Sequence, residues 1–343
     1  MFIPWHHSSF RFTGRWSGLK EQAHPSASMP SAAQTTAPGA YFEFSFSGKA
    51  ALLNFDLGYG AQPLPHLWIE LDGAGAVEAP VDRFLRVQAS TEDVHLVRVT
   101  YKGGMEQLHR WHAPLVGAIR LAGATADAPA PLPPDDRQMI EFVGDSITEG
   151  VLTDADFAPD SDVYDQTLRP YQDDNLATYS ALTAARLNLR PLFQAYGAVG
   201  VTHGGCGGVP RAGLIYPFVF EDTPYAGPRP DYVLINHGVN DMNSPSDLFA
   251  LRYDELLDTV HRHAPQATII CLTPFYGVFQ QEIRACVDTC NAAHGRCAHY
   301  ICTDGWVPKE PIHPLRSGHQ IIADHLTPLL SQIIAHTVSN KKK

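Results

Sequence analysis

Three short segments of the sequence carry side chains that could together hydrolyse an ester. Ser146 closes a Gly-Asp-Ser triplet that follows the apolar run 139–143. Asn240 lies in a Gly-Val-Asn-Asp tetrad after the apolar run 232–235, and His313 lies in an Ile-His-Pro triplet near the C-terminus. A serine hydroxyl is a weak nucleophile until a base removes its proton, and histidine titrates near neutrality, where that base is needed. The Ser146 amide and the Asn240 side chain could donate hydrogen bonds to the developing oxyanion.

Each of these segments also has a purely structural interpretation. A Gly-Asp-Ser triplet after a strand is a common strand-to-helix turn, and a Gly-x-Asn-Asp tetrad is a common start of a capped helix. Their order along the chain and their placement after apolar runs favour the catalytic interpretation. An α/β-hydrolase would need the pattern Gly-x-Ser-x-Gly around its nucleophile, and here Thr148 occupies the position of the second glycine.

The second half of the chain must position these residues. Short apolar runs alternate there with helix-like segments, which indicates an α/β fold with a doubly wound, mainly parallel sheet. The functional residues of such folds lie in loops at the carboxyl ends of the strands. The expected helices span residues 176–187, 247–263, 279–293 and 319–336, and further strands span residues 191–195 and 268–272.

The first half of the chain has the two-residue period of β-strands. In the run Tyr41–Ser47, three phenylalanines fall on one face, which must then be buried. Several such runs separated by turns predict an N-terminal β-sandwich domain over residues 1–126, with a long surface loop over residues 21–39. The Pro-rich segment 127–137 is then the linker to a second domain that spans residues 138–343.

The composition excludes several classes of partner. The formal net charge is −11 at pH 7 and the basic residues cluster only at Lys341–Lys343, so we expect no nucleic-acid partner. No apolar run approaches the roughly 18 residues that a membrane span requires, so we expect no membrane partner. The N-terminus lacks the cationic start and apolar stretch of a secretory signal. This predicts a cytoplasmic chain, although a processed secreted chain would look the same.

We expect neither a metal ion nor an organic cofactor. The six cysteines lie in the second half without the Cys-x-x-Cys pairing of a zinc site, and we interpret them as reduced structural thiols. The acidic stretch 154–174 could be a metal loop or a lid over the site. Its spacing fits no calcium loop, which favours a solvated insertion.

The order of these segments resembles the SGNH, or GDSL-type, hydrolase superfamily, whose four blocks carry Ser, Gly, Asn and His in that order. The resemblance covers the whole second domain. It implies that Ser146 is the nucleophile, Asn240 an oxyanion donor and His313 the general base. Water activated by the same histidine would then release the acyl group from the serine.

Two positions of the pattern depart from the family. Gly197 and Gly200 both lie in its second block, and we take Gly197 as the preferred oxyanion glycine and Gly200 as the alternative. The family usually has an aspartate three residues before its histidine, where this chain has Glu310. Either Glu310 or a backbone carbonyl could therefore orient His313. Asp304 is a poorer candidate on spacing.

The first half of the chain adds to the resemblance. The run Phe12-Thr13-Gly14-Arg15-Trp16, the aromatic strand that ends at Phe46-Ser47-Gly48 and the Pro-rich joint are similar to the two-domain acetyl esterases of carbohydrate esterase family 2. The resemblance implies a jelly-roll-like first domain and the removal of O-acetyl groups from polysaccharides or oligosaccharides. The expected partner is then a small-molecule or oligosaccharide ester, with Asp145 near the substrate. Trp306 would be either an aromatic wall for a sugar ring or a packing residue.

Two other functions stay open from the sequence. The chain could be a carbohydrate-binding protein whose second domain has little activity, although the presence of Ser146, Asn240 and His313 together argues against this. It could also be an SGNH esterase or thioesterase that acts on other small acyl esters. Cleavage of 4-nitrophenyl acetate that Ser146→Ala abolishes would distinguish hydrolysis from binding.

Overall fold

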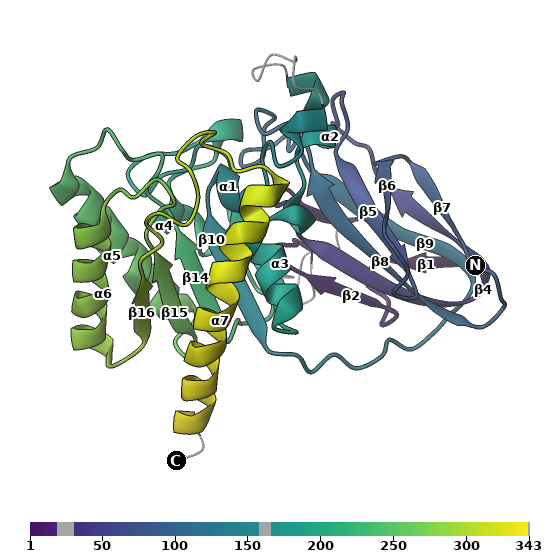
Figure 1. The fold of residues 1–343 in the computed structure, drawn as a ribbon. Helices are drawn as coiled ribbons and strands as arrows, with labels where there is room; N and C mark the ends of the chain where they lie inside the picture. Colours follow the sequence, from purple (N-terminus) through teal and green to yellow (C-terminus); the bar gives the residue numbers. More distant parts are fainter. Residues whose placement is uncertain (19–30, 158–165, 342–343) are drawn as a thin grey trace.

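The chain forms two lobes, seen side by side in a computed structural model that describes residues 1–18, 31–157 and 166–341 (Figure 1). We call residues 1–129 the antiparallel lobe and residues 138–341 the parallel lobe. Part of the loop expected over residues 21–39 lies outside the described residues. So does part of the acidic stretch 154–174.

The parallel lobe is built on one parallel sheet. Within the described ranges its strands are β10 (Met139–Gly144), β11 (Arg190–Ala195), β14 (Tyr232–Asn236), β15 (Thr268–Leu272) and β16 (Ala298–Ile301), in the order β11-β10-β14-β15-β16. Consecutive side chains point to opposite faces, so that Val233 and Ile235 belong to one apolar cluster and Leu234 to another. Both faces of the sheet are buried, which explains why its strands are continuous apolar runs in the sequence.

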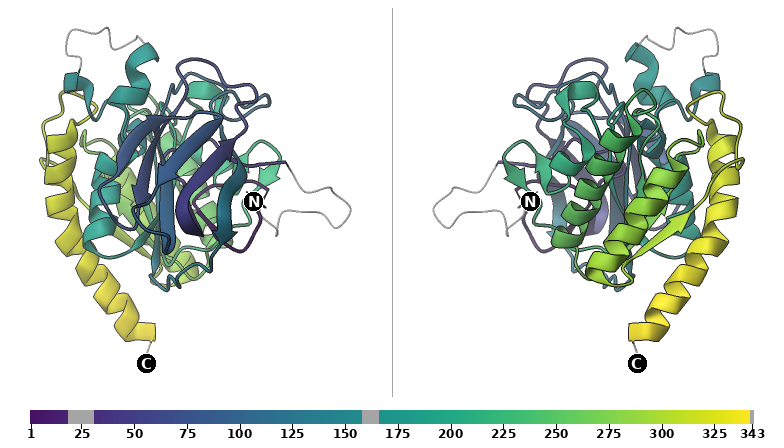
Figure 2. Two further views of the ribbon diagram at one scale, coloured as in Figure 1. Left: turned by 90° about the vertical axis from the view of Figure 1, so that its right-hand side faces the viewer. Right: turned by 90° about the vertical axis from the view of Figure 1, so that its left-hand side faces the viewer.

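Helices cover both faces of this sheet, as Figure 2 shows from two sides. One face carries α4 (Ala212–Ile215), α5 (Ser246–His263) and α6 (Gln280–His294), and the other carries α3 (Tyr179–Arg186) and α7 (Arg316–Lys341). The shorter elements of the lobe are α1 (Ser146–Glu149), α2 (Arg169–Gln172), the 3-10 turns η2 (Ala155–Phe157), η3 (Gln166–Leu168), η4 (Asn175–Ala177) and η5 (Cys206–Gly208), and a hairpin of β12 (Phe218–Phe220) with β13 (Thr223–Pro224). The expected doubly wound, mainly parallel α/β fold is confirmed.

The antiparallel lobe contains an aromatic core. Among the described residues its strands are β1 (Phe2–Pro4), β2 (Phe10–Thr13), β3 (Ala33–Thr35), β4 (Tyr41–Phe55), β5 (His66–Leu71), β6 (Val77–Pro80), β7 (Phe84–Gln88), β8 (Val94–Gly103) and β9 (Ile119–Pro129). The first half of β4 lies between β2 and β8, and its second half lies between β7 and β9. One long strand thus joins two layers of the sandwich. Phe42, Phe44 and Phe46 are fully buried between these layers.

The junction between the lobes begins later than the sequence suggests. β9 continues to Pro129, where it pairs with Phe46, so the start of the expected linker 127–137 belongs to the antiparallel sheet. The amide of Ala130 then donates to the carbonyl of Ser45 at 3.0 Å. Alternating polar and apolar residues could have shown this extension, but the prolines of the segment obscure it.

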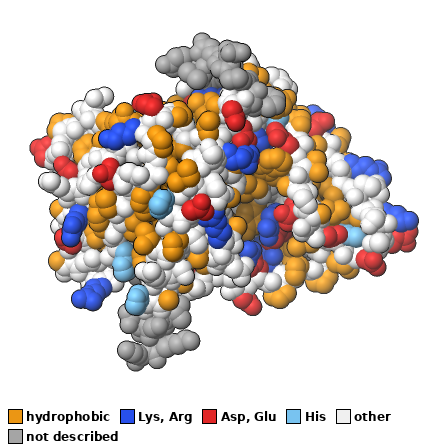
Figure 3. Space-filling view, in the orientation of Figure 1, with side chains coloured by type: hydrophobic (Ala, Val, Ile, Leu, Met, Phe, Trp, Pro, Cys, Tyr) orange, Lys and Arg blue, Asp and Glu red, His pale blue; other side chains and the backbone are white. Residues whose placement is uncertain are grey.

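The two lobes share a buried interface. Arg15 of the antiparallel lobe pairs with Glu141 of β10 at 2.5 Å, and both side chains are almost completely buried. A shallow cleft between the lobes is lined by Trp68 and Arg98 on one side and Phe193 on the other. Figure 3 shows the surface hollowed between the lobes, with acidic and basic side chains interspersed on that face. No helix of the described residues is long and apolar enough to cross a membrane.

Candidate active site

Ser146 lies at the carboxyl end of β10, at the first position of α1. Asp145 is the N-cap of this helix, and its side chain accepts a hydrogen bond from the amide of Ile147 at 3.0 Å. Gly144 leaves no room for a side chain, because a methyl group there would overlap the hydroxyl of Thr148. The turn therefore holds the serine side chain in a fixed place at the end of the sheet, 5% exposed.

His313 is brought to the serine by the segment that connects β16 with α7. Its Nε2 lies 2.9 Å from Oγ of Ser146, within hydrogen-bonding distance. Burial lowers the pKa of His313, while nearby Glu106 raises it and Arg169 lowers it further. The ring is therefore held in the neutral form that can accept the serine proton.

Glu310 is not placed against this histidine. Its side chain is exposed, and its carboxylate accepts a hydrogen bond from the hydroxyl of Tyr276 at 3.4 Å. No carboxylate of the described residues forms an ion pair or hydrogen bond with His313. The spacing of three residues between Glu310 and His313 therefore does not produce the contact that the family pattern implied.

Asn240 lies in the loop that follows β14, next to the serine turn across the sheet. Its side-chain amide donates to the carbonyl of Val199 at 3.1 Å, which leaves its second N–H for another acceptor. The adjacent Asp241 is fully buried and accepts hydrogen bonds from the amides of Val201 and Thr202, at 3.0 and 2.9 Å. These bonds tie the loop after β14 to the loop after β11.

The two candidate oxyanion glycines have different surroundings. The amide of Gly197 forms a hydrogen bond with the carboxylate of Glu149, which stabilises the charged form of that acid. The amide of Gly200 donates to the carbonyl of His203 at 3.1 Å, and a side chain at this position would overlap Asp241. Gly200 directly follows Val199, whose carbonyl accepts the hydrogen bond from Asn240. Each of the two amides thus has an acceptor within the protein, Glu149 for Gly197 and His203 for Gly200, and the preference for Gly197 stays a prediction.

Asp145 and Trp306 both make contacts within the protein, and their expected roles at the substrate stay predictions. Burial raises the pKa of Asp145 to about 7, and its carboxylate is occupied as the helix cap. Trp306 stacks on His325 with ring centroids 5.2 Å apart and packs against the apolar cluster under α7. Of the two roles considered for this tryptophan, the structure favours packing.

Several charged residues near the site were missed from the sequence. Glu106 and Arg110 come from the β8–β9 loop (residues 104–118) of the antiparallel lobe, and Arg169 comes from α2. Arg110 pairs with Glu149 in the same helix as Ser146, and Arg169 pairs with Glu106 at 2.9 Å. No periodicity or spacing marks these residues. Only Glu149 could have been singled out from the sequence, because it is a charged residue three positions after the proposed nucleophile.

The strand order explains why these loops meet. β10 lies between β11 and β14. After β10 the chain continues to β11 on one side, whereas after β14 it continues to β15 on the other side. The loops that follow β10 and β14 diverge at this point and leave a crevice, which is where doubly wound sheets bind their ligands. Ser146 and Asn240 lie at its two sides. Among the described residues, no cluster of His, Cys, Asp or Glu side chains has a metal-binding arrangement.

Comparisons with known proteins agree with this architecture. The cellulase/esterase CelE of Acetivibrio thermocellus is 28% identical over 317 residues, which cover 82% of this chain and 36% of that protein. The chain thus spans about a third of the length of this curated relative. A family two carbohydrate esterase from Clostridium thermocellum in complex with cellohexaose has a TM-score of 0.74 at 20% identity, covering 95% of this chain and 99% of that one.

Two further solved structures share both lobes. A family two carbohydrate esterase from Cellvibrio japonicus has a TM-score of 0.76 at 16% identity, covering 98% of each chain. An acetyl xylan esterase from Butyrivibrio proteoclasticus has a TM-score of 0.74 at 18% identity, covering 98% of this chain and 99% of that one. At these identities the likeness shows the two-lobed fold.

A comparison of the sequence with models of protein families identifies the family of this chain. The model of the GDSL-like lipase/acylhydrolase family matches residues 142–321, which is over half of the chain and includes the segments of Ser146, Asn240 and His313. The chain therefore belongs to the GDSL-like lipase/acylhydrolase family, the class of ester hydrolases that these three segments predict.

Proposed function

We propose that the chain hydrolyses short acyl esters, with O-acetyl groups on carbohydrates as the natural substrate. The observation that carries the proposal is the 2.9 Å contact between Oγ of Ser146 and Nε2 of His313. The carbohydrate part rests on the solved structures of similar fold, which include carbohydrate esterases and an acetyl xylan esterase. The acetyl part rests on the same likeness.

The first half of the reaction acylates the serine. His313 accepts the proton of Ser146 as the oxygen attacks the ester carbonyl, and a tetrahedral intermediate forms with negative charge on the former carbonyl oxygen. The side-chain amide of Asn240, the amide of Ser146 and the amide of Gly197 or Gly200 donate hydrogen bonds to this oxygen, and the glycine amide must first leave its present acceptor, Glu149 or His203. Loss of one such donor typically costs roughly 2.7 to 4 kcal/mol of transition-state stabilisation. The protonated His313 then gives its proton to the leaving sugar hydroxyl.

The second half of the reaction releases the acid. A water molecule gives a proton to His313 as it attacks the acyl carbonyl, and the bond to Oγ of Ser146 breaks after a second tetrahedral intermediate. The proton returns to the serine, and acetate leaves. No step requires a metal or an organic cofactor, because His313 transfers every proton and backbone and amide donors stabilise the charge.

The test compares acyl chain length and alcohol. We expect turnover of 4-nitrophenyl acetate to exceed that of the butyrate and octanoate esters, and release of acetate from acetylated xylo-, manno- or cello-oligosaccharides. Ser146→Ala should abolish both activities without changing the circular dichroism spectrum. Faster turnover of longer esters, or no acetate from any acetylated sugar, would contradict the substrate assignment.

A binding function is the second candidate. One similar structure contains cellohexaose, and another is of a carbohydrate esterase whose active site displays divergent catalytic and non-catalytic binding functions. Calorimetric titration of Ser146→Ala with cellohexaose measures this function separately. Binding without any hydrolysis by the wild-type chain would favour it over the esterase.

A further inference from the structure

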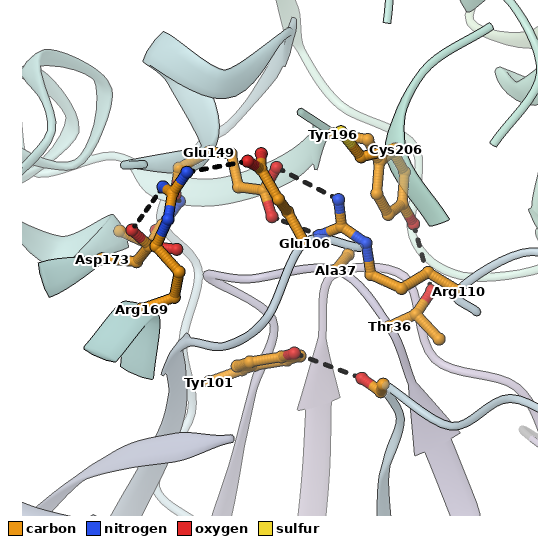
Figure 4. Close-up of polar contacts among 12 residues, drawn as sticks. Thr36, Ala37, Tyr101, Glu106, Arg110, Glu149, Arg169, Asp173, Tyr196 and Cys206 are labelled. Atoms are coloured by element: carbon orange, nitrogen blue, oxygen red, sulfur yellow. Dashed lines mark hydrogen bonds and ion pairs between the residues drawn. The ribbon is translucent and has the colours of Figure 1, made fainter. Parts of the chain in front are cut away.

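A cluster of buried charged side chains lies where the two lobes meet (Figure 4). Its members are Glu106 and Arg110 of the β8–β9 loop, Glu149 of α1, and Arg169 and Asp173 at the two ends of α2. The side chains are between 2% and 10% exposed. The proposed mechanism gives none of the five a chemical step. Burying charges is costly, so their arrangement needs a separate explanation.

Arg110 connects two parts of the candidate active site. Its guanidinium pairs with the carboxylate of Glu149, on the helix that begins with Ser146. The same group lies over the ring of Tyr196, 5.1 Å from the centroid. Tyr196 is the first residue of the segment 196–208, which we call the β11 loop. One side chain of the antiparallel lobe therefore touches both the nucleophile helix and the loop that contains Gly200.

The β11 loop is held by the β8–β9 loop along its length. A side chain at Gly197 would overlap the carboxylate of Glu106, and one at Gly207 would overlap the carbonyl of Leu108. The amide of Arg110 donates to the carbonyl of Gly207 at 3.0 Å. Close backbone contacts of this kind leave the loop few alternative positions.

Tyr196 is fixed from a second direction by the antiparallel lobe. Its hydroxyl lies 3.4 Å from that of Thr36, and its ring is completely buried. Its carbonyl accepts a hydrogen bond from the amide of Val199 at 3.2 Å, and the carbonyl of Val199 accepts from Asn240 at 3.1 Å. Two hydrogen bonds thus connect Tyr196 with Asn240, one of the proposed oxyanion donors.

We propose that Arg110 is a positioning residue of the esterase site, which sets the distance between the nucleophile helix and the oxyanion-binding β11 loop by bridging Glu149 and Tyr196. The proposal rests on the proposed function, because it concerns the geometry of the same reaction. It also gives the antiparallel lobe a role in catalysis. That lobe supplies no reacting atom, but it supplies the contact that aligns the donors with Ser146.

The experiment replaces Arg110 by Met and measures two quantities. The first is kcat and KM for 4-nitrophenyl acetate, and the second is the rate at which a fluorophosphonate labels Ser146. We expect kcat to fall at least roughly tenfold with KM changed less than about threefold, because misplaced donors lose transition-state rather than ground-state contacts. Labelling should slow in parallel, since the phosphoryl oxygen needs the same donors. Arg110→Lys keeps the charge and should recover part of both rates.

The matched control is Arg15→Met. Arg15 also forms a buried pair across the lobe interface, with Glu141, but it contacts the carbonyls of Tyr216 and Phe218 rather than the β11 loop. It should lower the melting temperature comparably while kcat and labelling per folded molecule stay within about twofold of wild type. If Arg110→Met does not fold, the double variant Arg110→Met/Glu149→Gln removes the unpaired charge and should restore folding without restoring the rates.

Three outcomes decide between the proposals. Rates of Arg110→Met, or of the folded double variant, within about twofold of wild type would overturn the positioning role. A wild-type chain that is labelled at Ser146 but releases no acetate would overturn the substrate assignment, while the labelling rates still decide the role of Arg110. A wild-type chain that is neither labelled nor active would overturn both.

Discussion

Nε2 of His313 lies 2.9 Å from Oγ of Ser146, across 167 positions of the sequence. No carboxylate of the described residues forms a hydrogen bond or ion pair with this imidazole. We therefore propose that the pair acts as a dyad. A dyad works when the ring is held in place by packing and kept neutral by burial, and the lowered pKa of His313 agrees with that requirement.

Glu310→Gln should leave kcat within about twofold of wild type, because the carboxylate is exposed and bonded to Tyr276 rather than to His313. Steady-state rates on 4-nitrophenyl acetate measure this. The control is Tyr276→Phe, which removes the only hydrogen bond to Glu310 that the described residues show. A drop of tenfold or more in Glu310→Gln alone would restore the triad that the family pattern implied.

The pH dependence of kcat/KM should report the ionisation of His313. The ring must be neutral to accept the serine proton, and burial lowers its pKa, so the neutral form persists to a lower pH than in a free imidazole. We therefore expect kcat/KM to rise with pH to a plateau, with a midpoint below the ordinary value of about 6.5. A midpoint above that value would show that the ring is stabilised in its charged form.

Glu106→Gln and Arg169→Met should move this midpoint in opposite directions. The anion of Glu106 raises the pKa of His313 and the cation of Arg169 lowers it, while burial remains the main cause of the shift. Removal of Glu106 should therefore lower the midpoint, and removal of Arg169 should raise it. Both profiles are to be measured per folded molecule. Shifts of the same sign in the two variants would mean that changes in packing outweigh charge.

The sequence was sufficient for the parts of the site that lie on regular elements. Ser146 and Asn240 follow apolar runs that had to be parallel strands, and such strands end at one edge of the sheet. Their proximity follows from topology alone. The same reasoning predicted the long helices α3, α5, α6 and α7 with ends that differ by at most five residues, since each has an apolar face that covers the sheet, whereas the short helices α1, α2 and α4 were not predicted.

The parts of the site that depend on loop conformation could not be predicted. The choice between Gly197 and Gly200 depends on which amide can turn to the oxyanion from its present acceptor, Glu149 for Gly197 and His203 for Gly200, and no spacing rule contains that information. Arg110 lies in a loop of the other lobe, so its contact with Glu149 arises only when the lobes dock. The role expected of Glu310 assumed a fixed geometry between neighbours in the chain, but its side chain turns to Tyr276 instead.

Asn240→Ala should lower kcat by about 10² to 10³-fold with little change in KM, because the amide would donate to the oxyanion and not to the ground-state substrate. Asn243→Ala is the matched control on the same loop, since its side chain is exposed. Stopped-flow or steady-state assays with 4-nitrophenyl acetate are sufficient. If KM of Asn240→Ala rose by as large a factor as kcat fell, the side chain would have a role in binding the ester and not only in stabilising the intermediate.

Asp145→Asn should change how stability depends on pH. Burial raises the pKa of Asp145 to about 7, whereas an unfolded aspartate titrates near 3.9. The stabilising contribution of the neutral carboxyl is therefore fully present below about pH 4 and is lost as the pH rises through about 7. Asparagine can still accept the hydrogen bond from Ile147 and cannot ionise, so the variant should melt at a higher temperature than wild type at pH 8. The two melting temperatures should converge as the pH falls.

Asp247→Asn, at the exposed start of α5, is the control, because solvent hydrates that charge in the folded chain. A variant that melts below wild type at pH 8 would show that the charged carboxylate is a better cap than the amide, and that its burial costs less than the environment of Asp145 implies.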